Sequence, residues 1–510
     1  MKKFFKTLFS RVFIVALLML AQIAAIIAVL TWLKDYFWWV TIVLDAFAVI
    51  TVLYILNSPS HPSYKIMWIL LIALFPIFGG PLYMIFANKK ISKRQRKKLE
   101  PLNKVLARVT KADSQTLEKI ALKDADAYSQ MRYIHDYSRT PAYAYTESKY
   151  YPLGDDLFPD LLEALKGAKK FIFLEYFIIE PGLVWDRILA VLKEKVALGV
   201  DVRILYDDFG CSSTLPSYYY MYLRKLGIKA HAVSRFKLLL DVRMNNRDHR
   251  KIAVIDGKYG FTGGMNLADE YINAKVRFGH WKDNGIRLSG EGVYGLTLMF
   301  LTHWASLSDT VDDYPKFMSK LTSESTSSLG YVQPYGDIPF DDESVAKNIY
   351  LNMFGRAHKY IHAMTPYLIL DNEMITALSN AAKQGLDVKI IVPHIPDKKT
   401  IFEMTRANYP ELIKNGVRIY EYTPGFIHAK MAIADDVYAN IGTVNLDYRS
   451  LYLHMECGVF LYDAPCIADM EKDFASTLKK SKEITKEDLQ KTSVLRRLFR
   501  SILNVFAPLV

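Results

Sequence analysis

The chain carries one polar motif twice, in the pattern H-x-K-x-x-x-x-D, at residues 249–256 and 428–435. Each histidine is followed seventeen positions later by an asparagine, in a turn of small residues. Similar segments recur in the same order around both copies: 168–177 with 357–367, 199–205 with 385–391, and 227–229 with 416–418. A repeat that keeps its order over this length predicts two homologous halves that meet near residue 325.

The apolar residues between these motifs predict the fold class of the halves. Apolar runs such as 171–177 and 202–205 alternate with helical patterns such as 188–198. Short apolar runs are typical of strands buried on both faces, and their alternation with helices is typical of α/β proteins. We expect a charged helical connector over 99–140, a first half over 141–324 and a second half over 325–483.

The first ninety residues hold most of the chain's apolar excess. Segments 12–33, 37–56 and 66–87 are each long enough to cross a bilayer core of about 30 Å. We therefore predict a membrane-anchoring region over 1–98 with two to three transmembrane helices. A secretory signal is the weaker interpretation of the first segment, because its apolar stretch is longer than is usual for a signal. The basic cluster at 89–98 favours a cytoplasmic position for the larger, C-terminal part of the chain, although three spans would put the basic N-terminus on the opposite face.

The net charge of +12, from 65 basic and 53 acidic residues, favours an anionic partner. Nucleic acid and anionic lipid both qualify, and the apolar N-terminal segments favour lipid. The basic amphipathic tail at 484–510 places three arginines among leucine, isoleucine and phenylalanine at helical spacing. This pattern is typical of an interfacial helix, and it also fits a helix packed on the protein surface. The three cysteines have no C-x-x-C spacing and indicate neither a disulfide framework nor a zinc site.

The duplicated motif supplies the side chains that phosphodiester chemistry needs. One neutral imidazole can attack phosphorus and form a phosphohistidine, while a second protonates the leaving alkoxide and later deprotonates the incoming hydroxyl. A lysine two residues after each histidine on a strand points to the same face, where its charge can stabilise phosphate oxygens. This chemistry requires no metal and no cofactor.

These considerations predict two sets of site residues. The candidate catalytic residues are His249, Lys251, Asp256, His428, Lys430 and Asp435. We expect the two aspartates, which come after the apolar strands at the start of turns, to organise the backbone rather than to carry protons. The candidate substrate-binding residues lie in the small-residue turns, where glycine allows close approach of a phosphate and asparagine can donate to it: Gly264, Asn266, Thr443 and Asn445.

The residues around both motifs resemble the phospholipase D superfamily, and specifically the bacterial cardiolipin synthases. The sequence NRDHRK at 246–251 is similar to the family's first motif, and GTVNLDYRS at 442–450 is similar to its second. Segment 68–86 resembles the membrane segment that precedes the catalytic part of these synthases. The resemblance implies two phospholipase D-type α/β/α sandwich halves with pseudo-twofold symmetry, plus an N-terminal transmembrane helical region.

The same resemblance implies roles for individual residues. Asp283 would orient His249, and Glu456 would orient His428. His249 would be the nucleophile and His428 the general acid and base, or the two roles would be reversed. Glu175 and Tyr367 are candidate pocket residues, with simple strand packing as the equally good alternative.

The activity implied is transfer of a phosphatidyl group from one phosphatidylglycerol to another, which gives cardiolipin and glycerol. The expected partners are phosphatidylglycerol and anionic membrane lipid, at a bacterial cell membrane that the chain crosses more than once, with the catalytic part in the cytoplasm. Hydrolysis, or transfer to another alcohol, remains an alternative because it would use the same phosphohistidine. A nuclease is disfavoured by the membrane segments and by the lack of a nucleic-acid module, and a non-catalytic membrane scaffold by two intact motifs.

Overall fold

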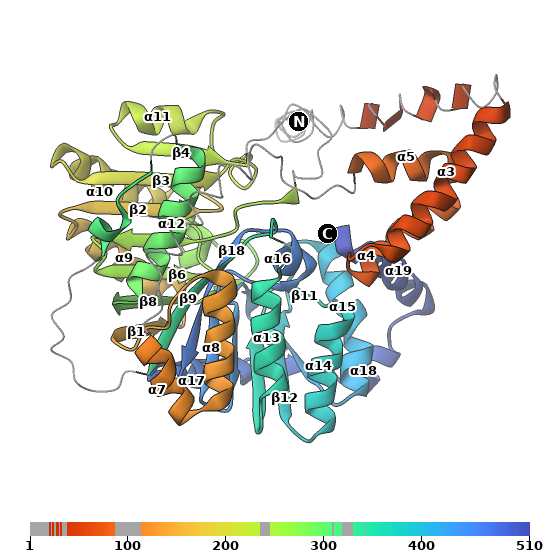
Figure 1. Ribbon diagram of the computed structural model, residues 1–510. Coiled ribbons are helices and arrows are strands. Elements are labelled where there is room, and N and C mark those ends of the chain that lie inside the picture. The colour runs from red at the N-terminus through yellow and green to blue at the C-terminus, as the bar shows by residue number, and fades with distance from the viewer. Residues whose placement is uncertain are drawn as a thin grey trace.

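The computed structural model describes scattered residues between 20 and 32 and then residues 38–86, 114–234, 245–308, 311–318, 330–341 and 343–509. The predicted apolar segment 12–33, the basic cluster at 89–98, the first part of the connector and the predicted boundary at 325 lie largely or wholly outside these residues. Figure 1 shows two α/β bodies side by side, with the N-terminal helices projecting to one side.

Each body is built on one main sheet. The first sheet has seven strands in the order β1-β8-β6-β5-β2-β3-β4. Its strands in that order are β1 (Thr146–Tyr151), β8 (Gly285–Gly290), β6 (Tyr259–Gly263), β5 (Ile252–Ile255), β2 (Phe171–Tyr176), β3 (Asp201–Asp207) and β4 (Lys229–Val233). β2, β3 and β4 are parallel to one another, whereas β5, β6, β8 and β1 add antiparallel neighbours.

The second sheet repeats this order and adds one strand. It runs β9-β18-β16-β15-β10-β12-β13-β19. Its strands are β9 (Tyr331–Asp337), β18 (Glu456–Tyr462), β16 (Tyr438–Gly442), β15 (Met431–Ala434), β10 (Tyr360–Met364), β12 (Asp387–Pro393), β13 (Arg418–Tyr422) and β19 (Ser481–Glu483). The chain therefore contains two α/β units of matching topology, as the ordered sequence repeat predicted.

Helices cover the outer faces of the sheets and fill the space between them. α9 (Gly154–Lys166), α10 (Leu183–Ala197) and α11 (Tyr219–Lys225) belong to the first body; α13 (Val345–Gly355), α14 (Asn372–Lys383), α15 (Lys399–Lys414), α16 (Tyr448–Tyr452) and α18 (Lys486–Gln490) belong to the second. α12 (Val293–Leu307) and α17 (Cys466–Leu478) share one buried apolar cluster that contains residues of both sheets. The bodies therefore meet over a continuous core.

The described part of the predicted connector is helical and belongs to the second body. α7 (Ser114–Lys123) and α8 (Ala125–Ser138) bury Ile120, Met131 and Ile134 in the core that covers β10 and β12. Apolar residues at helical spacing on one face of a helix are the cause of this packing. The connector is thus packed against the half that is more distant in sequence.

The N-terminal helices are α3 (Trp38–Asn57), α4 (Pro62–Leu74) and α5 (Pro76–Phe86). None of the helices in the described part of the chain is both long and apolar enough to cross a membrane. α3 lies at the span predicted at 37–56, and α4 and α5 lie at the span predicted at 66–87. The second of these segments is divided at Phe75, because Pro76 has no N–H to continue the helix and restricts the residue before it.

Candidate active site

The two motif histidines lie where the bodies meet, and each is held by backbone of the opposite half. The backbone N–H of His249 donates to the carbonyl of Met455 at 2.9 Å, and that of His428 donates to the carbonyl of Lys282 at 2.7 Å. β7 (His280–Lys282) of the first half also pairs in parallel with β14 (Gly425–Ile427) of the second. Both histidine side chains are buried. The motifs therefore form one composite site.

Each imidazole contacts a carboxylate from the other half. His249 Nδ1 lies 3.0 Å from both carboxylate oxygens of Glu456, and His428 Nδ1 lies 2.8 Å from Asp283 Oδ2. The pairing implied by the family resemblance, Asp283 with His249 and Glu456 with His428, is therefore wrong. The reason is that the segment after each motif pairs with the residues just before the histidine of the other half: β7 pairs with β14, and Met455 pairs with Asp248.

These contacts fix the form of the imidazoles. Burial lowers the pKa of His249 to about 3 and that of His428 to about 4, against the opposing pull of the carboxylates. Burial raises the pKa of Asp283 and of Glu456, but their interactions with the histidines, hydrogen bonds included, more than offset this effect, so the pKa of Asp283 is about 2 and that of Glu456 is well below its usual range. At neutral pH each imidazole is thus neutral, donates from Nδ1 to a carboxylate, and keeps a lone pair on Nε2.

The two motif lysines occupy matching positions. Lys251 Nζ donates to the backbone carbonyl of His249 at 2.6 Å, and Lys430 Nζ donates to that of His428 at 2.5 Å. Burial lowers the pKa of Lys251 to about 8 and that of Lys430 to about 7. The charge of Lys251 also lowers the pKa of both His428 and Lys430, so the two motifs interact electrostatically within one site.

The residues of the two small-residue turns support the histidines and carboxylates. A Cβ on Gly264 would lie 1.9 Å from Asp283 Oδ1, so only glycine leaves room for the carboxylate that holds His428. Thr443 donates its hydroxyl to Glu456 and accepts from the N–H of Cys457 at 3.0 Å. Gly264 and Thr443 therefore contact the carboxylates that hold the histidines, and their role in binding a phosphate stays a prediction.

The two motif asparagines are both buried close to the histidines. Asn266 accepts from the N–H of Ile178 at 3.0 Å and donates to the hydroxyl of Tyr271 at 2.7 Å; the ring of Tyr271 packs edge-on against His428. Asn445 donates to Asp447 at 3.3 Å, and its carbonyl oxygen has no hydrogen-bond partner within the described residues. One N–H of each side-chain amide is left for a ligand.

The motif aspartates hold backbone turns away from the imidazoles. Asp256 accepts three backbone N–H bonds from Lys169 to Phe171, at 2.7–2.8 Å. Asp435 accepts the equivalent three bonds from His358 to Tyr360, at 2.6–2.9 Å. Both aspartates have positive φ in the hairpin turns that come after β5 and β15. Asp256 and Asp435 were included among the catalytic candidates, and this placement corrects that inclusion. It agrees with their expected role as organisers of the backbone.

The two candidate pocket residues have separate partners. Glu175 is buried on β2, where Arg250 Nη2 and His303 Nδ1 each lie 2.8 Å from Glu175 Oε1. Tyr367 donates its hydroxyl to Asp397 at 2.6 Å. Glu175 therefore belongs to a buried charge cluster beneath the first motif rather than to an open pocket.

Several buried polar residues near the site were not identified from the sequence. His454 packs its ring 5.5 Å from that of His249, with Nδ1 at 3.7 Å from Glu456 Oε1. Asp248 pairs with Arg250 at 3.0 Å beside Glu175. The sequence offered a signal for three of these residues. His454 lies two residues before Glu456, and Asp248 and Arg250 lie on either side of His249. His303 gave none, because it lies on α12 far along the chain.

Two groups of described residues bring potential metal ligands within 4.8 Å of one another: His249, His454 and Glu456; and Glu175, Asp248 and His303. In the second group Arg250 already places a guanidinium against two carboxylates. In the first, Nδ1 of His249 is engaged by Glu456. These contacts engage the carboxylates of both groups, whereas the ring nitrogens of His454 have no hydrogen-bond partner within the described residues.

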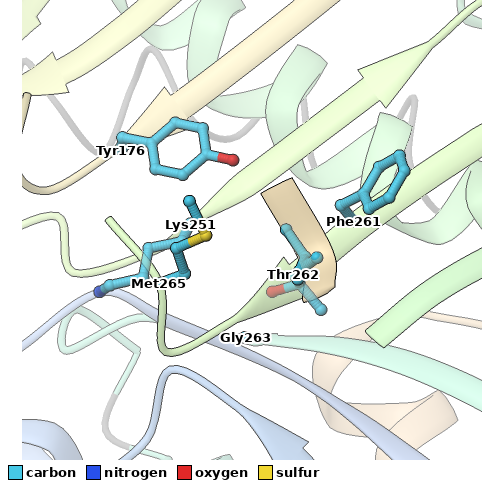
Figure 2. Close-up of a pocket in the computed structure, with 7 residues that line it drawn as sticks. Tyr176, Lys251, Phe261, Thr262, Gly263 and Met265 are labelled. Atoms are coloured by element: carbon cyan, nitrogen blue, oxygen red, sulfur yellow. The ribbon is translucent and has the colours of Figure 1, made fainter. Parts of the chain in front are cut away.

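Two cavities lie in this part of the structure. A cavity of about 10 Å³ borders Lys251, Thr262, Gly263 and Met265 (Figure 2). A larger cavity, of about 540 Å³, is lined by His280, Lys282 and α17 and includes neither motif histidine. Lys251 is only 1% exposed, so water is largely excluded from the lysine of the first motif.

Comparison with known proteins places this site in a family. The family model described as "Cardiolipin synthase, PLD-like domain" matches residues 161–276 and 350–478, and one described as "Phospholipase_D-nuclease N-terminal" matches residues 43–88. Both H-x-K-x-x-x-x-D motifs lie within the residues that the cardiolipin synthase model matches.

Whole-chain relatives extend the similarity. The chain is 34% identical to "Cardiolipin synthase 2" of Bacillus cereus, over 91% of this chain and 90% of that protein. It is 44% identical to an uncharacterised protein of Streptococcus mutans, over 90% and 99% of the two chains. Among solved structures, phosphatidylserine synthase of Haemophilus influenzae aligns with a TM-score of 0.57 at 15% identity, over 75% of this chain and all of the other, which shows a shared fold.

Proposed function

Because the chain belongs to the cardiolipin synthase family of the phospholipase D superfamily, we propose that it transfers a phosphatidyl group from one phosphatidylglycerol to the glycerol hydroxyl of a second. The products are cardiolipin and glycerol. The observation that carries this proposal is the composite site, in which two buried imidazoles each donate Nδ1–H to a carboxylate beside two buried lysines.

The first half-reaction forms a covalent intermediate. Nε2 of His249 attacks phosphorus, and the bond from phosphorus to the oxygen of the leaving glycerol breaks. His428, protonated at Nε2, gives its proton to that oxygen. An anionic diester in the site favours the protonated form of His428, because a nearby negative charge raises the pKa of an imidazole.

The second half-reaction regenerates the enzyme. The terminal hydroxyl of a second phosphatidylglycerol gives its proton to neutral His428, and its oxygen attacks phosphorus. The bond from phosphorus to Nε2 of His249 breaks, which releases cardiolipin and restores both imidazoles. Lys251 and Lys430 stabilise the charge on the non-bridging oxygens, and their charges act strongly because the site is buried.

We assign the nucleophile to His249 of the first motif, as the family resemblance implies. Burial lowers the pKa of both imidazoles, so each can present a neutral Nε2 to phosphorus. The general acid must take up a proton, which the anionic diester favours at His428.

Transfer rather than hydrolysis requires that water be kept from the intermediate. Both histidines are at most 8% exposed, and Lys251 is 1% exposed. A dry site favours an acceptor that arrives as a lipid headgroup over bulk water. We propose that the enzyme acts at the bacterial cell membrane, where phosphatidylglycerol is both donor and acceptor.

A product assay tests this proposal. Purified protein is mixed with phosphatidylglycerol vesicles, and the lipids are identified by mass spectrometry, with His428→Ala as the matched inactive control. We expect cardiolipin and glycerol in equal amounts. Phosphatidate without cardiolipin would assign the protein as a hydrolase, and absence of turnover would leave the scaffold interpretation.

A further inference from the structure

The C-terminal helix α19 (Val494–Val505) lies on the protein with its charged side inwards. Arg500 Nε donates to Glu403 Oε2 at 2.7 Å, and Arg496 donates to the same carboxylate at 3.1 Å from its Nε. Glu403 belongs to α15, and its carboxylate is only 13% exposed. Arg500 is itself buried. A helix on the surface of a water-soluble protein normally turns its apolar side, not its arginines, towards the protein.

The apolar side of α19 faces away from the protein. Its exposed large apolar residues share one side of the helix and are between 37% and 80% exposed: Val494, Leu495, Leu498, Phe499, Ile502 and Val505. Phe506 continues this stripe just after the helix. A contiguous exposed apolar surface of this kind marks a contact with another molecule or with a membrane.

A second exposed apolar stripe adjoins it on α4. α19 and the short helix η4 (Ala507–Leu509) both contact α4, and Figure 1 shows α19 and α4 next to each other. On α4, Ile66, Leu70 and Leu74 are 57%, 44% and 72% exposed and recur at four-residue spacing. α3, joined to α4 by a short turn, exposes further apolar residues along its length. The stripe on α19 therefore continues the apolar N-terminal surface.

We propose that the exposed faces of α19 and α4 bind the surface of an anionic lipid bilayer as one docking surface. The occupant is a membrane because the surface is made of helices, is flanked by arginine, and continues into the apolar α3. Arg496 is exposed at the edge of the stripe, and Arg497 lies on the flank. A helix with apolar residues on one side and arginines at its edges is suited to lie at the boundary between headgroups and acyl chains.

This surface is tied to the active site by direct contacts. Tyr448, the residue after Asp447 of the second motif region, donates its hydroxyl to Ser63 Oγ of α4 at 3.0 Å. Tyr448 also packs with Ala507 of η4 and Met404 of α15 in one buried cluster. The docking surface thus has a fixed position relative to Asn445 and the histidines. The proposal of this surface rests on the proposed function and deepens it, because it names the membrane contact of that site.

Depth-dependent quenching tests the proposal in the full-length protein. The native cysteines are all buried, so an environment-sensitive fluorophore can be attached to single cysteines introduced at exposed positions. Leu498→Cys and Ile502→Cys report on the apolar side of α19. Asn504→Cys, on the opposite exposed flank, is the matched control. The protein is mixed with vesicles of phosphatidylglycerol and phosphatidylcholine that carry nitroxide-labelled acyl chains.

We expect the labels at 498 and 502 to lose about half of their fluorescence and shift to the blue, while the label at 504 changes little, because an interfacial helix buries one face about 5–10 Å deep. Equal quenching at all three positions, or none, would overturn the proposal. Contact between labels of two copies without lipid quenching would assign the surface to self-association instead.

The quenching measurement is independent of catalysis. The same measurement in His249→Ala protein, which cannot turn over, should give the same quenching, so failure of the proposed activity and failure of the docking surface are distinguishable. Glu403→Gln removes the charge that holds both arginines, and should reduce the difference in quenching between 498 and 504 at least twofold. An unchanged difference in this variant would contradict the role given to Glu403 in orienting the helix.

Discussion

At the scale of single residues, the reactivity of each imidazole depends on a carboxylate supplied by the other half. Glu456 and Asp283 each accept from Nδ1 of a histidine and so leave Nε2 with the lone pair. Both carboxylates are fully buried. An amide in place of a carboxylate could stabilise the wrong tautomer and would remove the charge that stabilises imidazolium.

We predict that Asp283→Asn and Glu456→Gln each reduce kcat by about 10²–10⁴-fold, because a neutral partner no longer fixes the imidazole form. Steady-state transfer assays and circular dichroism of both variants check this. Asp397→Asn, in which the hydrogen-bond partner of Tyr367 is altered, is the control and should retain activity within about threefold. Near-native turnover in either site variant would contradict the orienting role.

The pH dependence should follow the two motif lysines. In the substrate-free site their pKa values are lowered to about 7 and about 8, so both ammonium groups lose their protons as the pH rises through this range. Only the charged form attracts the phosphodiester. We therefore expect kcat/KM to fall above about pH 7, where Lys430 begins to lose its proton, and the fall to move to higher pH in Lys251→Gln, because the charge of Lys251 lowers the pKa of Lys430. A profile that stays flat to about pH 10 would show that the lysine charge does not control binding.

Substitution of Gly264 tests how closely the two halves must approach each other at the candidate active site. A Cβ at this position would meet Asp283 Oδ1 at 1.9 Å and the backbone oxygen of His428 at 2.9 Å. Gly264→Ala should displace the carboxylate and lower kcat about 10²-fold, since misplacement of about 1 Å has costs of this size. Gly355→Ala, which meets no atom within 4 Å, is the matched control. Equal activity of the two variants would contradict the close approach.

At the scale of elements, the sequence predicted the strands that carry the motifs but not the partners of the residues that come after them. β5 and β15 are short apolar runs and are fully buried. Residues 280–283 gave no pattern that distinguishes pairing within a half from pairing across halves, so Asp283 was placed with the wrong histidine. The long-range pairing of β7 with β14 depends on how the two bodies pack, which local patterns do not encode.

The motif aspartates act on whole elements, because each holds a β-hairpin turn against the start of a strand. Asp256→Asn should lower the free energy of unfolding by about 1–3 kcal/mol, because one carboxylate oxygen that accepts backbone N–H bonds is replaced by an amide. Asparagine tolerates the positive φ, so strain does not add to the loss.

Thermal unfolding and transfer assays check this prediction. The folded Asp256→Asn protein should keep kcat/KM within about threefold, because the side chain takes no part in the reaction. A large loss of kcat with unchanged stability would instead make Asp256 a catalytic residue. Asp435→Asn is the matched variant in the second half and should behave alike.

At the scale of the whole molecule, the duplicated fold brings two incomplete sets of site residues together in one candidate active site. Each half supplies one histidine, one lysine and the carboxylate for the other half's histidine. The ordered repeat in the sequence allowed the two matching sheets to be predicted, and the doubled motif identified both histidines. The segment at 66–87 was predicted as one span in spite of Pro76, whereas the structure divides it at Phe75 into α4 and α5.

The histidine of the first motif, held by the carboxylate of the second half, is the group that we expect to carry the phosphatidyl group. The most direct measurement is a single turnover with phosphatidylglycerol labelled in its phosphate, quenched in base and mapped by mass spectrometry of the peptides. We predict an acid-labile, base-stable adduct on His249, and none in His249→Ala protein. An adduct on His428 alone would contradict the assignment of the nucleophile.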